Sequence, residues 1–102
     1  MSIQVLCIGD AMFDVIVRID VAPAKINYGS DTASRISTSS GGAAGNVAAW
    51  LTRTDARSTI VTHVGDDPAG AAIVADFDAL GVEHKELVIP GQASGVVIVL
   101  VD

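Results

Sequence analysis

The chain has 102 residues, half of them hydrophobic, and a formal charge of −6 at neutral pH. A chain of this length is one domain or less. Acidic residues outnumber basic ones and no basic cluster occurs, so neither nucleic acid nor an anionic membrane is an expected partner. The single cysteine, Cys7, can form no disulfide within the chain, which favours a reducing, cytoplasmic location. Residues 1–20 do not read as a secretion signal, and no apolar run is long enough to span a bilayer.

The first third of the chain has an extended character. Residues 3–8 form a short apolar run that predicts a buried strand ending at Gly9 and Asp10. β-Branched residues continue the extended pattern over residues 13–19. From 26 to 38, Ser and Thr alternate with other residues and large apolar groups are scarce. This pattern predicts a thin, half-exposed β ribbon rather than a core strand.

Helices and strands alternate after the ribbon. The predicted elements are a helix over 44–54, a strand over 58–64, a helix ending at Leu80, and strands over 82–89 and 95–101. Asp66, Asp67 and Pro68 supply the second helix with an N-cap acid and an N1 proline, and Gly81 follows its end. The alternation predicts an α/β layered domain with a largely parallel sheet. The large aromatic residues predicted to lie in the core are Phe13, Trp50 and Phe77.

The last predicted strand is unusual because residues 96–101 are apolar without alternation. Such a strand is expected to have both faces covered. Since the chain stops at Asp102 before supplying more helices, we expect it to be the N-terminal part of a larger domain. The alternative is a small complete domain that ends on an edge strand. An uncovered face would favour self-association or poor solubility of the isolated chain.

The stretch from Ser39 to Leu51 is the most informative part of the sequence for function. Glycine and alanine dominate it, so the backbone can turn sharply and another group can approach closely. A helix beginning here presents unpaired N–H groups and a partial positive charge, which suit a hydroxyl-rich or anionic small molecule. Asn46 carries a donor and an acceptor on one side chain and is the candidate residue for hydrogen bonds to a ligand within the bend.

Taken in order, these residues resemble the N-terminal third of the ribokinase-like (PfkB) family of carbohydrate kinases. The segments that carry the resemblance are the opening strand with 9–14, the Ser/Thr-rich ribbon, the Gly-Gly-Ala-Ala-Gly-Asn signature at 41–46, the step at 64–70, and Ser94 with Gly95. The resemblance implies a ribokinase-like layered α/β domain with a mostly parallel sheet and a small β lid. Residues 1–102 would then be the N-terminal part of a single sugar-kinase domain, with 20–40 as the lid segment.

The resemblance also implies an activity, which is transfer of the ATP γ-phosphoryl group to a sugar or a sugar-like alcohol. In the family, an aspartate at the position of Asp14 holds substrate hydroxyls, and residues at the positions of Gly41, Gly42 and Asn46 complete the sugar pocket. The lid covers the pocket and forms the dimer contact in many members. The implied partners are a sugar or nucleoside substrate, and either a second copy through the lid strands or a missing C-terminal part.

Departures from the family pattern limit what the chain could do alone. The family's catalytic base and anion hole lie in a downstream Gly-Ala-Gly-Asp motif, and neither that motif nor the ATP-contacting segments occur here. ATP and Mg²⁺ are therefore implied for a full-length member, and neither is expected to bind this chain alone. No catalytic residue and no metal ligand is predicted. Ala43 stands where ribose-phosphorylating members commonly carry lysine, which weakens a ribose assignment.

Two functional hypotheses remain open on the sequence. The first is a sugar kinase to which this chain contributes the substrate-binding half and the lid. The second is a non-catalytic small-molecule-binding or dimerisation module that uses the same pocket without chemistry. A dinucleotide-binding oxidoreductase is disfavoured because G-x-G-x-x-G is missing. The sequence does not choose among ribose, fructose, a deoxy-gluconate and a nucleoside.

Overall fold

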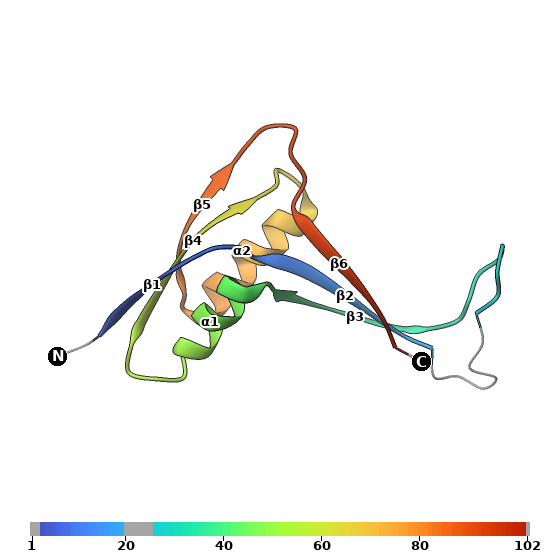
Figure 1. Cartoon of the computed structure of the whole chain (residues 1–102), viewed down its shortest axis with the longest axis horizontal. Helices are drawn as coiled ribbons and strands as arrows, with labels where there is room; N and C mark the ends of the chain where they lie inside the picture. The colour runs from blue at the N-terminus through green and yellow to red at the C-terminus, as the bar shows by residue number, and fades with distance from the viewer. Residues whose placement is uncertain (1–2, 20–25, 102) are drawn as a thin grey trace.

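The structure is a computed structural model that describes residues 3–19 and 26–101. It contains two helices and six strands within these residues (Figure 1). In chain order, the elements are β1 (Gln4–Ile8), β2 (Met12–Arg18), β3 (Arg35–Gly41), α1 (Ala43–Leu51), β4 (Arg57–Val64), α2 (Pro68–Leu80), β5 (Glu83–Val88) and β6 (Gly95–Val101). None of the described helices has the length and apolar character needed to cross a membrane.

The strands form two separate three-stranded sheets (Figure 1). Sheet A has the order β1-β4-β5, and all its strands are parallel. Sheet B has the order β3-β2-β6, with β2 antiparallel to β3 and parallel to β6. The predicted α/β architecture with mostly parallel strands is confirmed. The chain crosses from sheet A to sheet B within residues 9–11, between β1 and β2.

The hydrophobic core lies between sheet A and the two helices. Along β4 every second side chain is buried, and Ile60 is fully buried. That face of the sheet meets Ala48 from α1 and Ile73 and Phe77 from α2. Leu6 and Ile8 point to the other face of sheet A and are exposed. The helices therefore cover one face of sheet A and leave the opposite one open.

The ends of α2 follow the sequence signals. Asp67 is the N-cap, its side chain accepts a hydrogen bond from the Gly70 N–H at 2.8 Å, and Pro68 is the first helical residue. Gly81 closes the helix with a φ of 78°, a left-handed conformation that glycine adopts without strain. These predictions are confirmed. Helix α1 instead ends at Leu51, before the predicted residue 54, because the next three N–H groups bond three residues back in a tighter turn.

The predicted ribbon over 26–38 is only partly a strand. Strand β3 begins at Arg35 and continues to Gly41, because its pairing with β2 extends as far as Met12. Before it, residues 26–34 form a loop in which the Asn27 N–H donates to Thr32 Oγ1 at 2.9 Å. Of the predicted lid segment 20–40, residues 20–25 lie outside the described residues.

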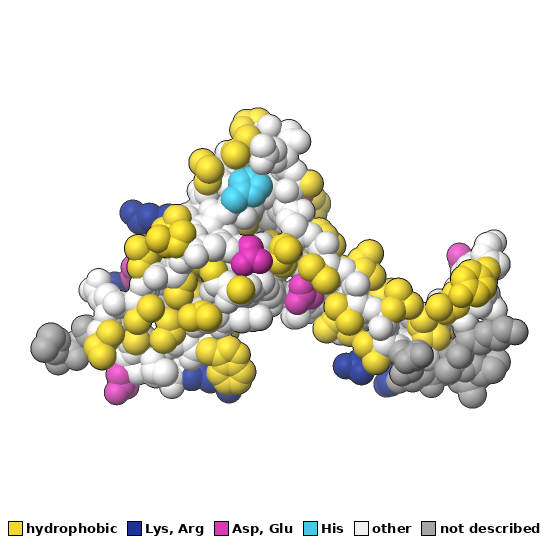
Figure 2. Space-filling model, viewed as in Figure 1, with side chains coloured by type: hydrophobic (Ala, Val, Ile, Leu, Met, Phe, Trp, Pro, Cys, Tyr) yellow, Lys and Arg dark blue, Asp and Glu magenta, His cyan; other side chains and the backbone are white. Residues whose placement is uncertain are grey.

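Strand β6 is uncovered, as expected where the chain supplies no further helices, whereas the predicted core position of Trp50 is wrong. Strand β6 pairs with β2 in sheet B, and its side chains at Val96, Ile98 and Leu100 are 50%, 65% and 60% exposed within the described chain. Trp50 is exposed rather than in the core, and its ring centroid lies 4.7 Å from the Arg53 guanidinium carbon. Apolar composition alone did not indicate which strands and aromatic rings the helices would cover. Hydrophobic side chains are visible along the arm that sheet B forms (Figure 2).

Candidate functional site

The junction between β3 and α1 is a sharp bend held against the crossing from β1 to β2. Gly42 has a φ of 89°, which suits glycine, and it is the N-cap of α1. A Cβ at Gly42 would lie 2.7 Å from the Asp10 carbonyl oxygen and 2.9 Å from Ala11 Cα. The Gly45 N–H donates to that same carbonyl at 3.1 Å. Within the signature, Gly42 is thus the glycine that close backbone approach requires.

Asp14 lies on β2, the central strand of sheet B, and is half-buried. Its backbone pairs with Ser39 on β3, and its carboxylate reaches along that strand to Gly41. A Cβ at Gly41 would collide with Asp14 Oδ2 and would lie 3.0 Å from Asp14 Cγ. The structure therefore brings Asp14 and Gly41 into direct contact, although they are distant in the sequence.

Asn46 lies in the first turn of α1 and its side chain is exposed. Its N–H donates to the Gly42 carbonyl at 2.8 Å, which fixes the residue to the bend through the backbone. Gly42 supplies no side-chain cap to the helix. A helix start without a side-chain cap keeps N–H groups and partial positive charge available to a ligand. The sugar-binding roles of Asp14, Gly41, Gly42 and Asn46 remain predictions.

A second polar cluster was not predicted as such. Asp67 accepts from the Ser94 N–H at 2.8 Å and from the Ser94 hydroxyl at 2.7 Å, while Ser94 Oγ accepts from the Gly65 N–H at 2.8 Å. Hydrogen bonds from Ser94 and then from the Gly70 N–H lower the pKa of the Asp67 carboxyl below its ordinary value. The sequence signalled the cap at the helix and the strand start at Ser94 separately. Their mutual bond depends on tertiary folding.

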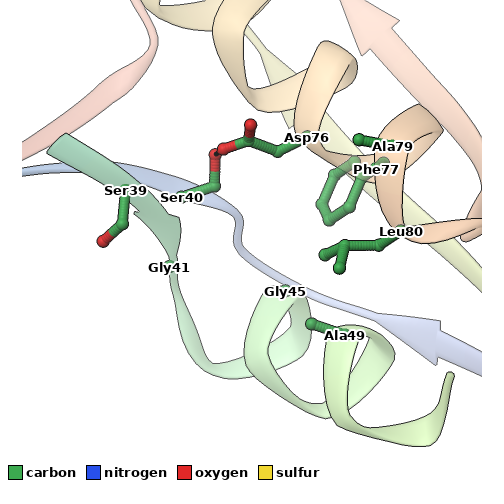
Figure 3. A pocket seen from close by; sticks show the side chains of 9 residues that line it. All are labelled: Ser39, Ser40, Gly41, Gly45, Ala49, Asp76, Phe77, Ala79 and Leu80. Carbon is green, nitrogen blue, oxygen red and sulfur yellow. Dashed lines mark hydrogen bonds between the residues drawn. The ribbon is translucent and has the colours of Figure 1, made fainter. Parts of the chain in front are cut away.

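A pocket of about 320 Å³ lies between β3, α1 and α2 (Figure 3). Most of its wall is apolar and comes from Gly45, Ala49, Phe77 and Leu80. At one end Ser40 donates a 2.5 Å hydrogen bond to Asp76 Oδ2, which joins β3 to α2. No motif in the sequence indicates a role for Ser40 or Asp76.

An Mg²⁺ ion that accompanies a nucleotide is usually held by one or two protein carboxylates together with phosphate oxygens and water. Among residues 3–19 and 26–101, no group of three or more His, Cys, Asp or Glu side chains is placed to hold a metal ion. The ATP and Mg²⁺ that the family implies belong to a full-length member.

The fold matches that of ribokinase-like sugar kinases. A solved carbohydrate kinase from Agrobacterium tumefaciens superposes with a TM-score of 0.83 at 19% identity, covering 96% of this chain and 31% of that one. Ribokinase from Giardia lamblia gives a TM-score of 0.80 at 20% identity, over 98% of this chain and 32% of its own. These likenesses establish the ribokinase-like fold.

Comparison of the sequence with known families identifies the family of the chain. The family model described as pfkB family carbohydrate kinase matches residues 2–102, and the chain belongs to that family. A curated relative, the ATP-dependent ribose-1-phosphate kinase of Halopiger xanaduensis, is 34% identical over 94 residues, which is 90% of this chain. The match covers 31% of that relative, so the chain spans about a third of its length.

Proposed function

We propose that the chain holds a sugar or sugar-like alcohol at the bend between β3 and α1, as the substrate-binding part of an ATP-dependent carbohydrate kinase. The observation that carries the proposal is the contact between the Asp14 carboxylate and the backbone of Gly41. A carboxylate accepts hydrogen bonds from two neighbouring hydroxyls, and an adjacent glycine lets a ligand reach the backbone. Membership of the family supports the same assignment.

In this proposal each residue has a distinct role. Asp14 accepts hydrogen bonds from substrate hydroxyls and so orients the sugar. Gly41 and Gly42 keep the bend free of side chains, and Asn46 offers a donor and an acceptor from the exposed first turn of α1. Phosphoryl transfer depends on positioning and charge stabilisation, and ATP with Mg²⁺ would be held by further parts of such a kinase.

Sheet B is proposed to act as the lid and as the contact with a second copy of the chain. Alternation places Ile36, Ile98 and Leu100 on the face opposite to Asp14, and all three are more than half exposed. A contiguous apolar face of this kind is typical of a protein–protein interface. The Asp14 face would then cover the sugar and exclude water, while the apolar face meets the second copy.

A titration of the chain with polyols tests the binding proposal. Ribose, fructose, a nucleoside and ribose-1-phosphate are added separately, the last because of the name of the Halopiger relative. Ligand binding to the folded state raises the melting temperature by mass action, and calorimetry gives Kd. Replacing Asp14 by Asn should weaken binding about tenfold or more, because hydrogen bonds to a charged group are lost. Asp55→Asn, in an exposed loop, is the control that should bind normally.

The non-catalytic small-molecule-binding or dimerisation module remains the second candidate, and the exposed apolar side chains of sheet B favour its dimerisation role. An assay with ATP, Mg²⁺ and a bound polyol separates the two when it is run on the gene's entire reading frame. Phosphorylated sugar supports the kinase. Polyol binding without transfer supports the module, and no binding of any polyol contradicts both.

A further inference from the structure

Helix α2 holds sheet B at both of its outer strands. At the N-cap of the helix, Asp67 bonds to Ser94, which comes directly before β6. Further along the helix, Asp76 accepts from Ser40, near the end of β3. Strand β2, which carries Asp14, lies between these two strands. One helix therefore fixes the strands on either side of the proposed sugar-binding carboxylate.

The Asp67 contact is tightly fitted and consists of several hydrogen bonds. Ser94 is buried, and its hydroxyl both donates to Asp67 and accepts from the Gly65 N–H. A Cβ at Gly65 would lie 2.6 Å from the Ala93 carbonyl carbon, and one at Gly70 would lie 2.9 Å from Ser94 Oγ. Packing and hydrogen bonds together leave this end of sheet B little freedom to move.

The Asp76 contact has a different character. It is a single hydrogen bond, and it lies at the polar end of the pocket of about 320 Å³ (Figure 3). Ser40 directly precedes Gly41, and strand alternation points its side chain away from the face that carries Asp14. The hydrogen bond therefore restrains β3 on the face opposite to Asp14. It does so at the residue directly before Gly41, which contacts the Asp14 carboxylate.

We infer that Ser40 and Asp76 are positioning residues, through which α2 sets the place of Gly41 against Asp14. The inference rests on the proposed function for its consequence in sugar binding, whereas its structural part stands without it. When the Ser40 hydroxyl is removed, β3 keeps its pairing with β2 but loses its side-chain hydrogen bond to α2 beside the open pocket. Gly41 and the start of α1 then move relative to Asp14, and the groups proposed to bind the polyol are no longer held together.

Two variants and two controls test the inference. Ser40→Ala and Asp76→Ala remove the bond, and Ser40→Thr keeps the hydroxyl as the conservative rescue. Thr38→Ala is the matched control, because Thr38 lies on the same face of β3, is exposed and forms no bond to α2 among those of the described residues. Ser40→Ala and Asp76→Ala remove the same hydrogen bond from opposite sides, so either variant that folds is sufficient for the test.

The first readout needs no ligand. Amide hydrogen exchange is measured at Gly45 and Asn46, whose N–H groups bond to Asp10 and Gly42 across the bend, and at Ile60 in the core. Loss of one hydrogen bond should speed exchange at the bend about threefold to tenfold and leave Ile60 unchanged. Ser40→Thr and Thr38→Ala should match the parent chain. Equal acceleration at Ile60, or none at the bend, would overturn the inference.

The second readout is the Kd for the best polyol, compared with the melting temperature. A positioning role predicts a Kd raised about threefold to tenfold in Ser40→Ala, with normal affinity in Ser40→Thr. A Kd unchanged at a lowered melting temperature assigns the bond to stability alone and contradicts positioning. If the parent chain binds no polyol, the proposed function fails, while the exchange readout still decides the positioning role.

Discussion

Strand β6 of sheet B is more apolar than strand β4 of sheet A, yet only β4 contributes side chains to the buried core. Strand β4 of sheet A contributes Ile60 and Val64 to the buried cluster beneath α1 and α2. Strand β6 of sheet B is an unbroken apolar run, and most of its side chains are exposed. Burial here depends on which strand the helices reach. The proposed site lies where the packed region meets the uncovered one.

The largest expected difference between the two sheets comes from one substitution made in each. Ile60→Ala removes a fully buried side chain and should lower the free energy of unfolding by about 2–5 kcal/mol. Ile98→Ala changes a side chain that is 65% exposed and should cost about 0.5 kcal/mol or less at low concentration. Urea denaturation monitored by circular dichroism measures both.

Protein concentration sharpens this comparison. If a second copy covers β6, Ile98→Ala will also weaken association, which light scattering detects as a shift toward monomer. Equal losses for Ile60→Ala and Ile98→Ala in dilute monomer would contradict the difference in burial between the sheets.

The joint between the sheets should respond strongly to a single methyl group. Gly42→Ala places a Cβ within 2.9 Å of Asp10 and Ala11 and forces alanine to a φ of 89°. Gly29→Ala is the matched control, with a φ of 74° and nothing within 4 Å of its Cβ. The control carries only the left-handed backbone cost of about 1 kcal/mol, and the Gly42 variant should exceed it. Equal melting temperatures for the two variants would show that the bend can relax.

Local patterns predicted most of the helix and strand positions. The N-cap at Asp67, the proline after it and the glycine at 81 defined α2 correctly, because capping depends on neighbouring residues. Family resemblance indicated the glycine bend, and its position at the joint of two sheets agrees with a role for close backbone approach. Nothing local showed that β2 and β6 would leave sheet A and form a sheet with β3.

Long-range contacts account for what the sequence did not predict. The bond from Ser40 to Asp76 and the bonds from Ser94 to Asp67 join residues distant along the chain. Serine and aspartate at such positions are ordinary surface residues by composition. Trp50 was misplaced for a similar reason, since helical spacing fits the core face while the ring is in fact stacked on Arg53 at the surface. Only the packing of α2 and α1 against the sheets decides these contacts.

Acid should loosen the contact between α2 and β6. Because its bonds to Ser94 lower the pKa of Asp67 in the folded state, the stability that Asp67 contributes is complete above its unfolded value near 3.8. That contribution is lost as the pH falls through the lower folded pKa. Asp67→Asn should therefore flatten the acid side of a plot of melting temperature against pH. Asp66→Asn leaves the three hydrogen bonds to Asp67 in place and should keep the acid-side fall in melting temperature. An acid-side fall that is the same in Asp67→Asn as in the parent chain would contradict the assignment to Asp67.

His84 should give the smallest effect, and one of opposite sign. Its ring nitrogens lie 2.6 Å from Glu86 Oε2 and 2.7 Å from Asp78 Oδ1, and these carboxylates raise the pKa of the imidazole above its ordinary value. A raised folded pKa contributes stability that is complete below the unfolded value of 6.5 and is lost as the pH rises through the folded pKa. His84→Gln should remove this alkaline-side decline and leave the acid limb, which depends on Asp67, unchanged.

The effect is expected to be small because the side chain of Asp78 is 67% exposed, where water and salt weaken an ion pair. Raising the salt concentration should therefore reduce the decline in the parent chain but not in His84→Gln. The ring also stacks on Phe77, with centroids 6.2 Å apart, so a loss of stability that is the same at every pH would reflect packing. Only the pH-dependent part of the loss of stability reflects the charge on His84. If the alkaline-side decline persists in His84→Gln, it belongs to another group.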